Sequence, residues 1–127
     1  MPVNHYETVT QEAVDMDGAE GCQVRWLIGQ DDGAPHFAMR QYEVACGGFT
    51  PRHQHPYEHE VFILEGQGVL FEGDVEQPLR AGDVAFVAPD QLHQFRNTGE
   101  TPLKFLCLIP HVTTDAGNAV SRDCTVE

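Results

Sequence analysis

Short apolar runs separated by turn-forming residues recur about every ten residues along this chain, and this spacing limits its possible folds more than any other feature. No long stretch places apolar residues at i, i+3, i+4 and i+7, so amphipathic helices are not expected. We therefore predict an all-β domain, a sandwich or barrel. The expected strands cover residues 23–28, 36–44, 59–64, 68–71, 75–79, 83–87, 93–97 and 103–109, and Gly47-Gly48 is an expected turn.

A length of 127 residues suits one domain with an N-terminal strand segment, which we place at residues 1–111. Residues 112–127 are small and polar without periodicity, and are expected to form a tail. The run at 61–64 is apolar on both faces of a strand, so both faces need cover. A partner copy or the N-terminal segment would supply the outer cover, and we expect a homodimer.

The net charge of -13 comes from 20 acidic against 7 basic residues, and it disfavours binding to nucleic acid and anionic membranes. No apolar stretch approaches the roughly 18 residues of a membrane span, and the first residues lack the pattern of a signal peptide. We expect a soluble, cytoplasmic protein. The four cysteines have irregular spacings, and we expect reduced thiols.

Three histidines fall within the segment 53–59, immediately before and at the start of the apolar run. His53 and His55 are two residues apart, so on an extended chain both imidazoles point to the same face and can bind one ion. His59 follows a Pro-Tyr corner and shares a strand face with Val61 and Ile63. This pattern predicts a metal site.

The segment from Gly47 to Gly66 resembles the first motif of the cupin family, with Gly47, His53 and His55 at the family spacing. The segment 82–97 resembles the second motif, with Gly82, His93 and Asn97 in register. It departs from that motif at Ala88, where proline is usual, and at Asp90, where glycine is usual. The resemblance covers roughly residues 24–110 and implies a cupin fold, the double-stranded β-helix or jelly-roll β-sandwich barrel. It also implies metal ligands, and here these would be His53, His55, His59 and His93.

The third ligand of the first motif has two candidates in this chain. The commoner cupin ligand at this place is a glutamate, which here would be Glu60. The run from His53 to Gly66 looks closest to small bacterial cupins with an all-histidine site, described as manganese-binding. We therefore predict that His59 is the ligand and that Glu60, with opposite strand parity, faces away.

Four neutral imidazoles leave the +2 charge of a divalent ion uncompensated, and an octahedral ion would keep two adjacent positions open. Manganese(II) is our first choice and iron(II) the second, while copper, nickel and zinc also fit imidazole sites. A structural zinc site would more often use cysteines in C-x-x-C pairs, which this chain lacks.

Several other residues would shape the site if their strand faces point inward. Arg40 and Cys107 are the candidate catalytic residues, and Phe95, Phe105 and Ile109 the candidate pocket residues. The alternatives are a solvated Arg40, which its type favours, and a Cys107 that acts only as a small buried hydrophobic residue. The three remaining histidines are expected at the surface: His5, His36 and His111.

Function has to be argued from the site, because one fold hosts many activities. The leading hypothesis is a metal-dependent oxidoreductase of dioxygenase type that acts on a small oxygen-containing molecule. The second is a non-redox isomerase or lyase acting on a hydroxy or keto acid, with the metal as Lewis acid. The third is a non-catalytic module that binds a small ligand, which the lack of an obvious general base favours.

Overall fold

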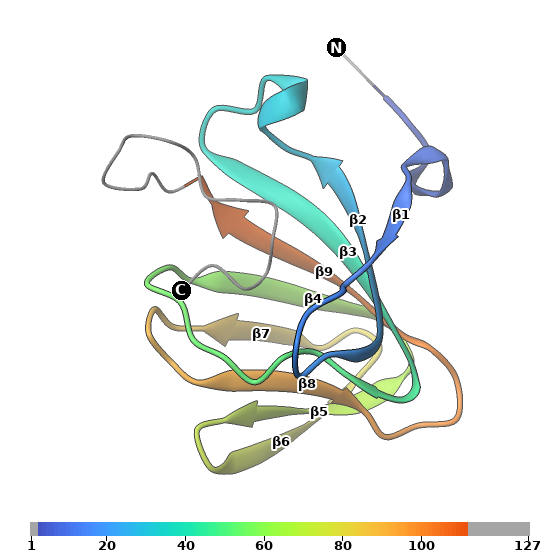
Figure 1. The fold of residues 1–127 in the computed structure, drawn as a ribbon, viewed down its shortest axis with the longest axis vertical. Coiled ribbons are helices and arrows are strands. Elements are labelled where there is room, and N and C mark those ends of the chain that lie inside the picture. Colours follow the sequence, from blue (N-terminus) through green and yellow to red (C-terminus); the bar gives the residue numbers. More distant parts are fainter. Residues whose placement is uncertain (1–2, 112–127) are drawn as a thin grey trace.

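The computed structural model describes residues 3–111, and almost all of this region is β-structure (Figure 1). The tail predicted at 112–127 lies outside the described residues. The strands are β1 (Gln11–Ala13), β2 (Glu20–Ile28), β3 (Phe37–Phe49), β4 (His59–Glu65), β5 (Gln67–Glu72), β6 (Val75–Arg80), β7 (Val84–Val87), β8 (His93–Asn97) and β9 (Leu103–Pro110). Two short 3-10 helices, η1 (Tyr6–Thr8) and η2 (Gln30–Asp32), flank β1 and β2.

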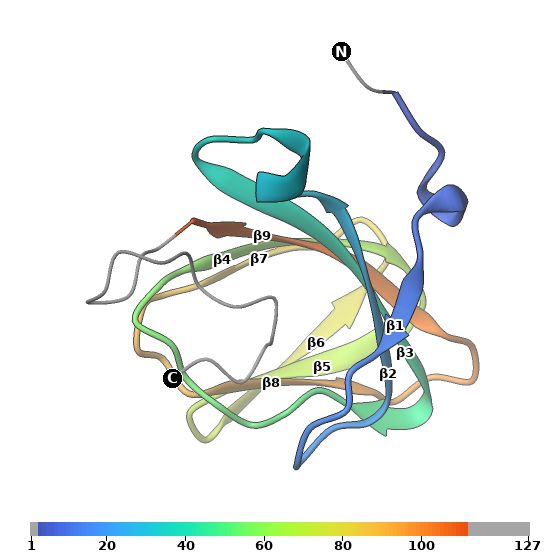
Figure 2. The same ribbon diagram turned by 45° about the horizontal axis from the view of Figure 1, so that its top comes forward.

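The strands form one curled antiparallel sheet with the order β6-β5-β8-β3-β9-β4-β7, and β2 and β1 extend it from β3. The long strand β3 pairs with β2 and β9 and, near its end, with β8 through Phe49 and Arg96. This strand therefore belongs to both halves of the curl, and Figure 2 shows the sheet bending around an interior. The predicted all-β architecture is confirmed.

Strict alternation of inward and outward residues fills that interior with apolar side chains. On β9 every odd position from Leu103 to Ile109 is buried, and the residues between them are half-buried. Phe105 is central to this core, with its ring stacked on Phe95 at 4.6 Å and on Tyr42 at 5.3 Å between centroids. Strand, face and core thus follow directly from the period-two pattern of the sequence.

The strand boundaries differ most from expectation at β3, which continues to Phe49 instead of ending at a turn at Gly47-Gly48. Gly47 has a φ of +78°, and the pairing with β2 shifts register between Glu20 and Cys22, so the chain bends without reversing. A Cβ atom on Gly48 would lie 2.5 Å from the carbonyl oxygen of Glu20, which requires glycine there. The short strand β1 belongs to the N-terminal segment, before the first of the strand ranges that the sequence predicted.

The outer face of β4 remains partly exposed in the described part of the chain. Phe62 is 44% and Leu64 is 40% exposed, and the neighbouring strand β7 adds Val84 and Phe86. The described N-terminal segment therefore does not cover this face. We call the exposed apolar residues of β4 and β7 the outer patch.

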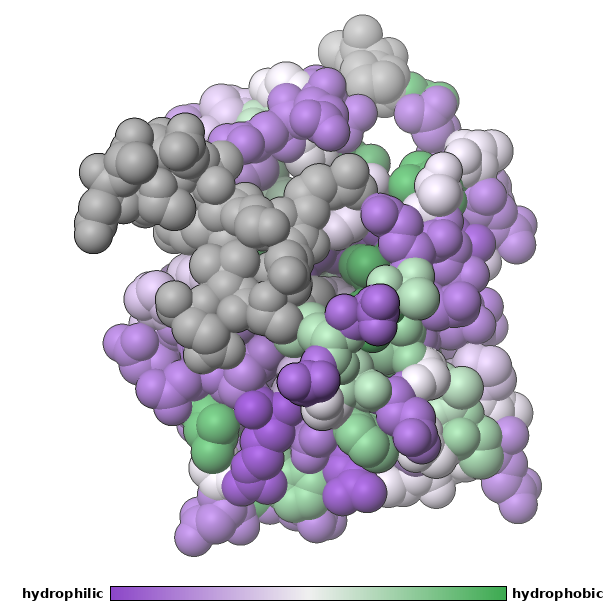
Figure 3. Space-filling view, in the orientation of Figure 1, coloured by the Kyte–Doolittle hydropathy of each residue, from purple (hydrophilic) through white to green (hydrophobic). Residues whose placement is uncertain are grey.

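Hydrophilic and apolar residues are interspersed on the face shown in Figure 3. Within residues 3–111, no helix has the length and apolar character that a membrane crossing would require. No disulfide joins Cys22, Cys46 and Cys107, while Cys124 lies outside the described residues.

Candidate metal centre

The segment that carries His53 and His55 lies between β3 and β4, where it is held against β8. The backbones of His53 and His93 form an isolated antiparallel bridge, with N to O distances of 3.1 and 2.9 Å. Just before it, Thr50 pairs with Phe95: the two backbones share a hydrogen bond of 2.9 Å, and the Thr50 hydroxyl accepts another from the amide of Phe95. Backbone hydrogen bonds thus fix the segment that carries His53 and His55 relative to His93.

Three of the predicted ligands meet in the interior of the curl. Ligand nitrogens of His53, His55 and His93 all lie within 4.8 Å of one another, and Nε2 of His53 is 3.1 Å from Nε2 of His55. Two nitrogens bound to one ion at about 2.1 Å and at right angles would be roughly 3.0 Å apart. The spacing therefore suits two adjacent positions around one metal ion.

The hydrogen bonding of the histidines also fits a metal ion. Nδ1 of His93 lies 2.9 Å from the carbonyl oxygen of Gln91, which makes Nδ1 the protonated nitrogen and leaves Nε2 as the ligand. Nδ1 of His53 and Nε2 of His59 are buried and have no hydrogen-bond partner among the described residues. Buried polar atoms without partners are costly, and a metal ion would satisfy such a nitrogen at His59.

His59, the first residue of β4, lies beside this cluster. Its ring centroid is 4.9 Å from that of His93 and 5.2 Å from that of His55, but its nitrogens fall outside the 4.8 Å group. Its Nδ1 lies 3.1 Å from Sγ of Cys107 and 3.4 Å from Nη2 of Arg40. The three-histidine cluster is present, and the role of His59 as fourth ligand stays a prediction. Glu60 is exposed on the outer face, as its parity predicted.

The electrostatics of the site keep two of its imidazoles, those of His53 and His59, neutral. Burial, together with the nearby His55 and His93, lowers the pKa of His53 from 6.5 to about 3. Burial and the adjacent Arg40 lower the pKa of His59 far below its usual range. Both rings therefore present lone pairs rather than positive charge at neutral pH, which is the form that binds metal ions.

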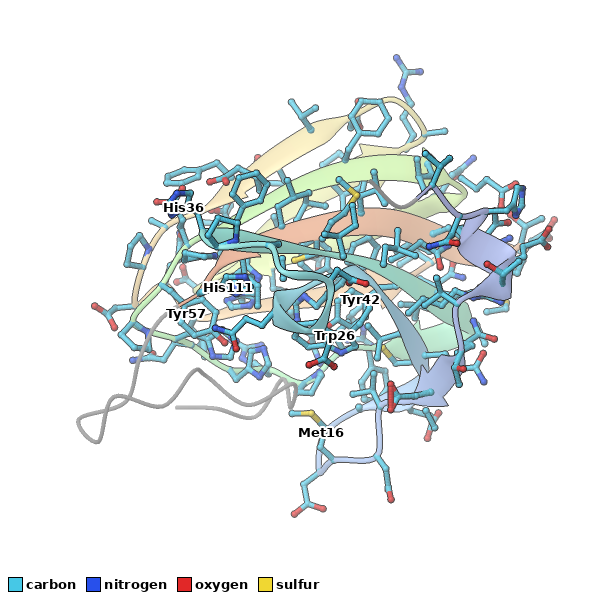
Figure 4. All side chains as sticks on the ribbon, turned by 90° about the horizontal axis from the view of Figure 1, so that it is seen from above. Met16, Trp26, His36, Tyr42, Tyr57 and His111 are labelled. Atoms are coloured by element: carbon cyan, nitrogen blue, oxygen red, sulfur yellow. The ribbon has the colours of Figure 1, made fainter. Side chains whose placement is uncertain are left out.

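Arg40 is buried, so the expectation of a solvated strand arginine is wrong. Only 2% of the residue is exposed, and its Nη1 donates to the hydroxyl of Tyr42 at 2.6 Å while Nη2 donates to Sγ of Cys107 at 3.0 Å. Its guanidinium carbon lies 5.4 Å from the ring centroid of Trp26 and 5.0 Å from that of Tyr42, two aromatic residues labelled in Figure 4. Aromatic rings and hydrogen bonds hold this cation in the interior. The sequence alone showed only that the neighbours of Arg40 along the chain are apolar.

A small cavity of about 30 Å³ opens beside the histidines. Arg40, Cys107, Phe95 and Phe105 line it together with the four histidines, so four of the five predicted pocket or catalytic residues meet at one place. Ile109 is buried in the core, and the described lining does not include it. A volume near that of one water molecule has room for a single ion.

Two further residues at the site are not distinguished by the sequence pattern. Tyr57, the tyrosine of the Pro-Tyr corner before His59, is buried with its ring stacked on His55 at 4.7 Å and an interplanar angle of 6°. Its position within the Pro-Tyr corner was the sequence signal that could have identified it as part of the site. Thr50 lines the cavity, and its burial follows from the bend of β3 that the sequence did not predict.

The remaining histidines lie away from the centre, as expected. His5 and His36 are exposed, and His111 is partly exposed, with Nε2 2.8 Å from the carbonyl oxygen of Ala34. His36 and His111 are labelled in Figure 4, and the amide of His111 donates to the carbonyl oxygen of His36 at 2.8 Å.

Comparison with known proteins settles the family. The sequence profile of the cupin domain matches residues 40–109, more than half of the chain. This protein is a cupin. The matched region spans β3 to β9 and includes all four predicted ligands, so the family assignment covers the same residues that build the site.

The relatives of this cupin have diverse names. It is 31% identical over 114 residues to the oxalate-binding protein of Thermotoga maritima, covering 86% of this chain and 93% of that one. It is 30% identical over 90 residues to 1-methylthio-D-xylulose 5-phosphate methylsulfurylase of Rhodospirillum rubrum, covering 66% of this chain and 58% of that one. Its structure superposes on the polyketide cyclase RemF from Streptomyces resistomycificus with a TM-score of 0.83 and 28% sequence identity. The match covers 100% of this chain and 87% of that one.

Proposed function

We propose that this cupin is a metal-dependent oxidoreductase of dioxygenase type, with manganese(II) or iron(II) on His53, His55, His59 and His93 and a small oxygen-containing molecule as substrate. The observation that supports it is the cluster of imidazoles beside a small cavity in the interior. When bound, such an ion supplies a Lewis acid and a coordination site for dioxygen.

The protein's own contribution is orientation and the exclusion of water. The apolar rings of Phe95 and Phe105 form one wall of the cavity, which keeps bulk solvent from the reacting atoms. The guanidinium of Arg40 reaches the cavity and favours a substrate with a negatively charged oxygen. A relative named as an oxalate-binding protein is consistent with a small carboxylate as ligand.

The second candidate is non-redox chemistry at the same site, on a hydroxy or keto acid, as an isomerase or lyase. One observation favours it: the thiol of Cys107 lines the cavity 3.1 Å from Nδ1 of His59, where oxygen chemistry would expose it to oxidation. The similarity to a protein named as a polyketide cyclase points the same way, since that name describes ring closure.

The metal site is tested first by elemental analysis of the purified protein and of two single-residue variants at adjacent positions in β4. We expect about one manganese or iron per chain in the wild type, loss in His59→Ala, and retention in Glu60→Ala, because Glu60 lies on the outer face. A site that loses its metal with Glu60 and keeps it without His59 would overturn the ligand assignment.

The reaction class is tested by dioxygen consumption with a panel of small hydroxy, keto and dicarboxylic acids. The protein is loaded in turn with manganese, iron and zinc. The proposal expects dioxygen uptake only with a redox-active ion. Turnover that persists with zinc and without dioxygen would establish the second candidate. Binding without turnover in every metal form would make the protein a ligand-binding module.

A further inference from the structure

Nδ1 of His59 lies against two buried side chains from neighbouring strands. Arg40 on β3 is directly opposite Cys107 on β9, and Cys107 is in turn opposite Val61 on β4, two residues after His59. The exposed fractions of Arg40, Cys107 and His59 are 2%, 2% and 5%. Nη2 of Arg40 is 3.0 Å from Sγ of Cys107, and Sγ is 3.1 Å from Nδ1 of His59.

The direction of these hydrogen bonds follows from what each group can do. A guanidinium has donors only, so the sulfur of Cys107 accepts from Arg40. The distance from Nη2 of Arg40 to Nδ1 of His59 is longer, 3.4 Å, so the sulfur is the better acceptor for that donor. The thiol can accept from an Nδ1–H group of His59 or donate its own S–H hydrogen to an unprotonated Nδ1, so the other nitrogen of the ring decides the tautomer.

The other nitrogen of His59 decides between these two tautomers. Nε2 is buried without a hydrogen-bond partner among the described residues. A proton on Nε2 would leave a buried N–H group without an acceptor, whereas a proton on Nδ1 has the sulfur of Cys107. The tautomer with the proton on Nδ1 leaves the Nε2 lone pair available.

We propose that Arg40 and Cys107 form a positioning pair that selects the Nδ1-protonated tautomer of His59 and keeps its Nε2 ready to bind a metal ion. The inference rests on the metal site of the proposed function. It gives the cysteine a role as hydrogen-bond acceptor behind a ligand, in the place where such sites commonly use a carboxylate or a backbone carbonyl. Neither residue needs to touch the substrate for this role.

The first test uses the metal-free protein, so it does not depend on activity. Long-range proton–nitrogen correlation by NMR distinguishes the two neutral tautomers, and a His59→Gln variant identifies the signals of His59. We expect the Nδ1-protonated form in the wild type and a shift toward the Nε2-protonated form in Cys107→Ala. A wild-type His59 protonated on Nε2 would overturn the inference.

The second test measures manganese(II) affinity by calorimetry. Cys107→Ala should weaken binding about ten- to a hundredfold, as the loss of a partner behind a ligand commonly does. Cys107→Ser, which keeps an acceptor, should restore affinity to within roughly threefold of wild type. Cys22→Ala removes another buried thiol, which does not line the cavity, and should leave affinity unchanged.

Unchanged manganese affinity in a folded Cys107→Ala protein would contradict the positioning role. If that variant fails to fold, Arg40→Met gives the same test, because the sulfur then loses the hydrogen bond that holds it beside Nδ1 of His59. Absence of manganese binding in the wild type would contradict the proposed function itself, while the NMR measurement would still decide the tautomer.

Discussion

The stability of the metal-free protein should fall as the pH is lowered from 7.5 to 5, because two imidazoles stay neutral in the folded state. His53, with a pKa lowered to about 3, and His59, lowered further, both remain unprotonated in this range. In the unfolded chain each takes up a proton below pH 6.5. The unfolded state therefore binds more protons, and stability is lost as the pH falls through 6.5.

The size of the effect follows from the unfolded pKa. At pH 5, 1.5 units below 6.5, each such histidine favours the unfolded state by about 2 kcal/mol. His53 is partly open to solvent, so we halve its share to about 1 kcal/mol. The sum of about 3 kcal/mol corresponds to a fall in Tm of roughly 12 °C for a domain of this size.

The assay is urea denaturation in a chelator at several pH values, with the double variant His53→Gln/His59→Gln as control. The acidic surface contributes its own pH dependence equally to both proteins, so the difference between them isolates the two imidazoles. Wild type should lose about 3 kcal/mol more than the variant between pH 7.5 and 5. Parallel curves would show that the histidines accept protons while folded and would refute the reasoning.

Three further predictions concern the fold and its assembly. Phe105→Ala should cost about 3–5 kcal/mol in urea denaturation, because it empties the centre of the core; a loss below about 1 kcal/mol would contradict this. Asn97→Ala should cost about 2–4 kcal/mol, since the buried amide bonds the carbonyl oxygens of Val44 and Thr101 and the amide of Gly99; an unchanged urea midpoint would count against it. We also propose a homodimer through the outer patch, so Phe86→Glu should reduce the light-scattering mass from two chains to one; a monomeric wild type would remove this proposal.

The sequence predicted the strands and the shared face of His53 and His55 because both depend on local periodicity, whereas the place of His93 beside them followed only from the cupin resemblance. The spacing of His53 and His55 and the parity of His59 and Glu60 were enough to place each side chain on its face. The burial of Arg40 was not predictable, because it depends on Tyr42 and Trp26 on the curled sheet, and residue type alone favours solvent.

Cys107 and Ile109 show a second limit of prediction from the sequence. Alternation placed both on the inner face of β9, which the structure confirms, but it did not reveal which of the two reaches the cavity. That depends on register with β4, where Cys107 pairs with Val61 beside His59. Register between distant strands is not visible in one sequence without structural information.

The backbone bridge between His53 and His93 has a consequence for how the protein would exchange its ion. These two residues bond to each other through their main chains, by hydrogen bonds in which no ion takes part, and Thr50 anchors the same segment to β8. The chain therefore meets an incoming ion with its ligands already arranged, and little conformational entropy is lost on capture. Removal of the ion should leave a folded, reloadable barrel, in contrast to small zinc domains that unfold when the metal is withdrawn.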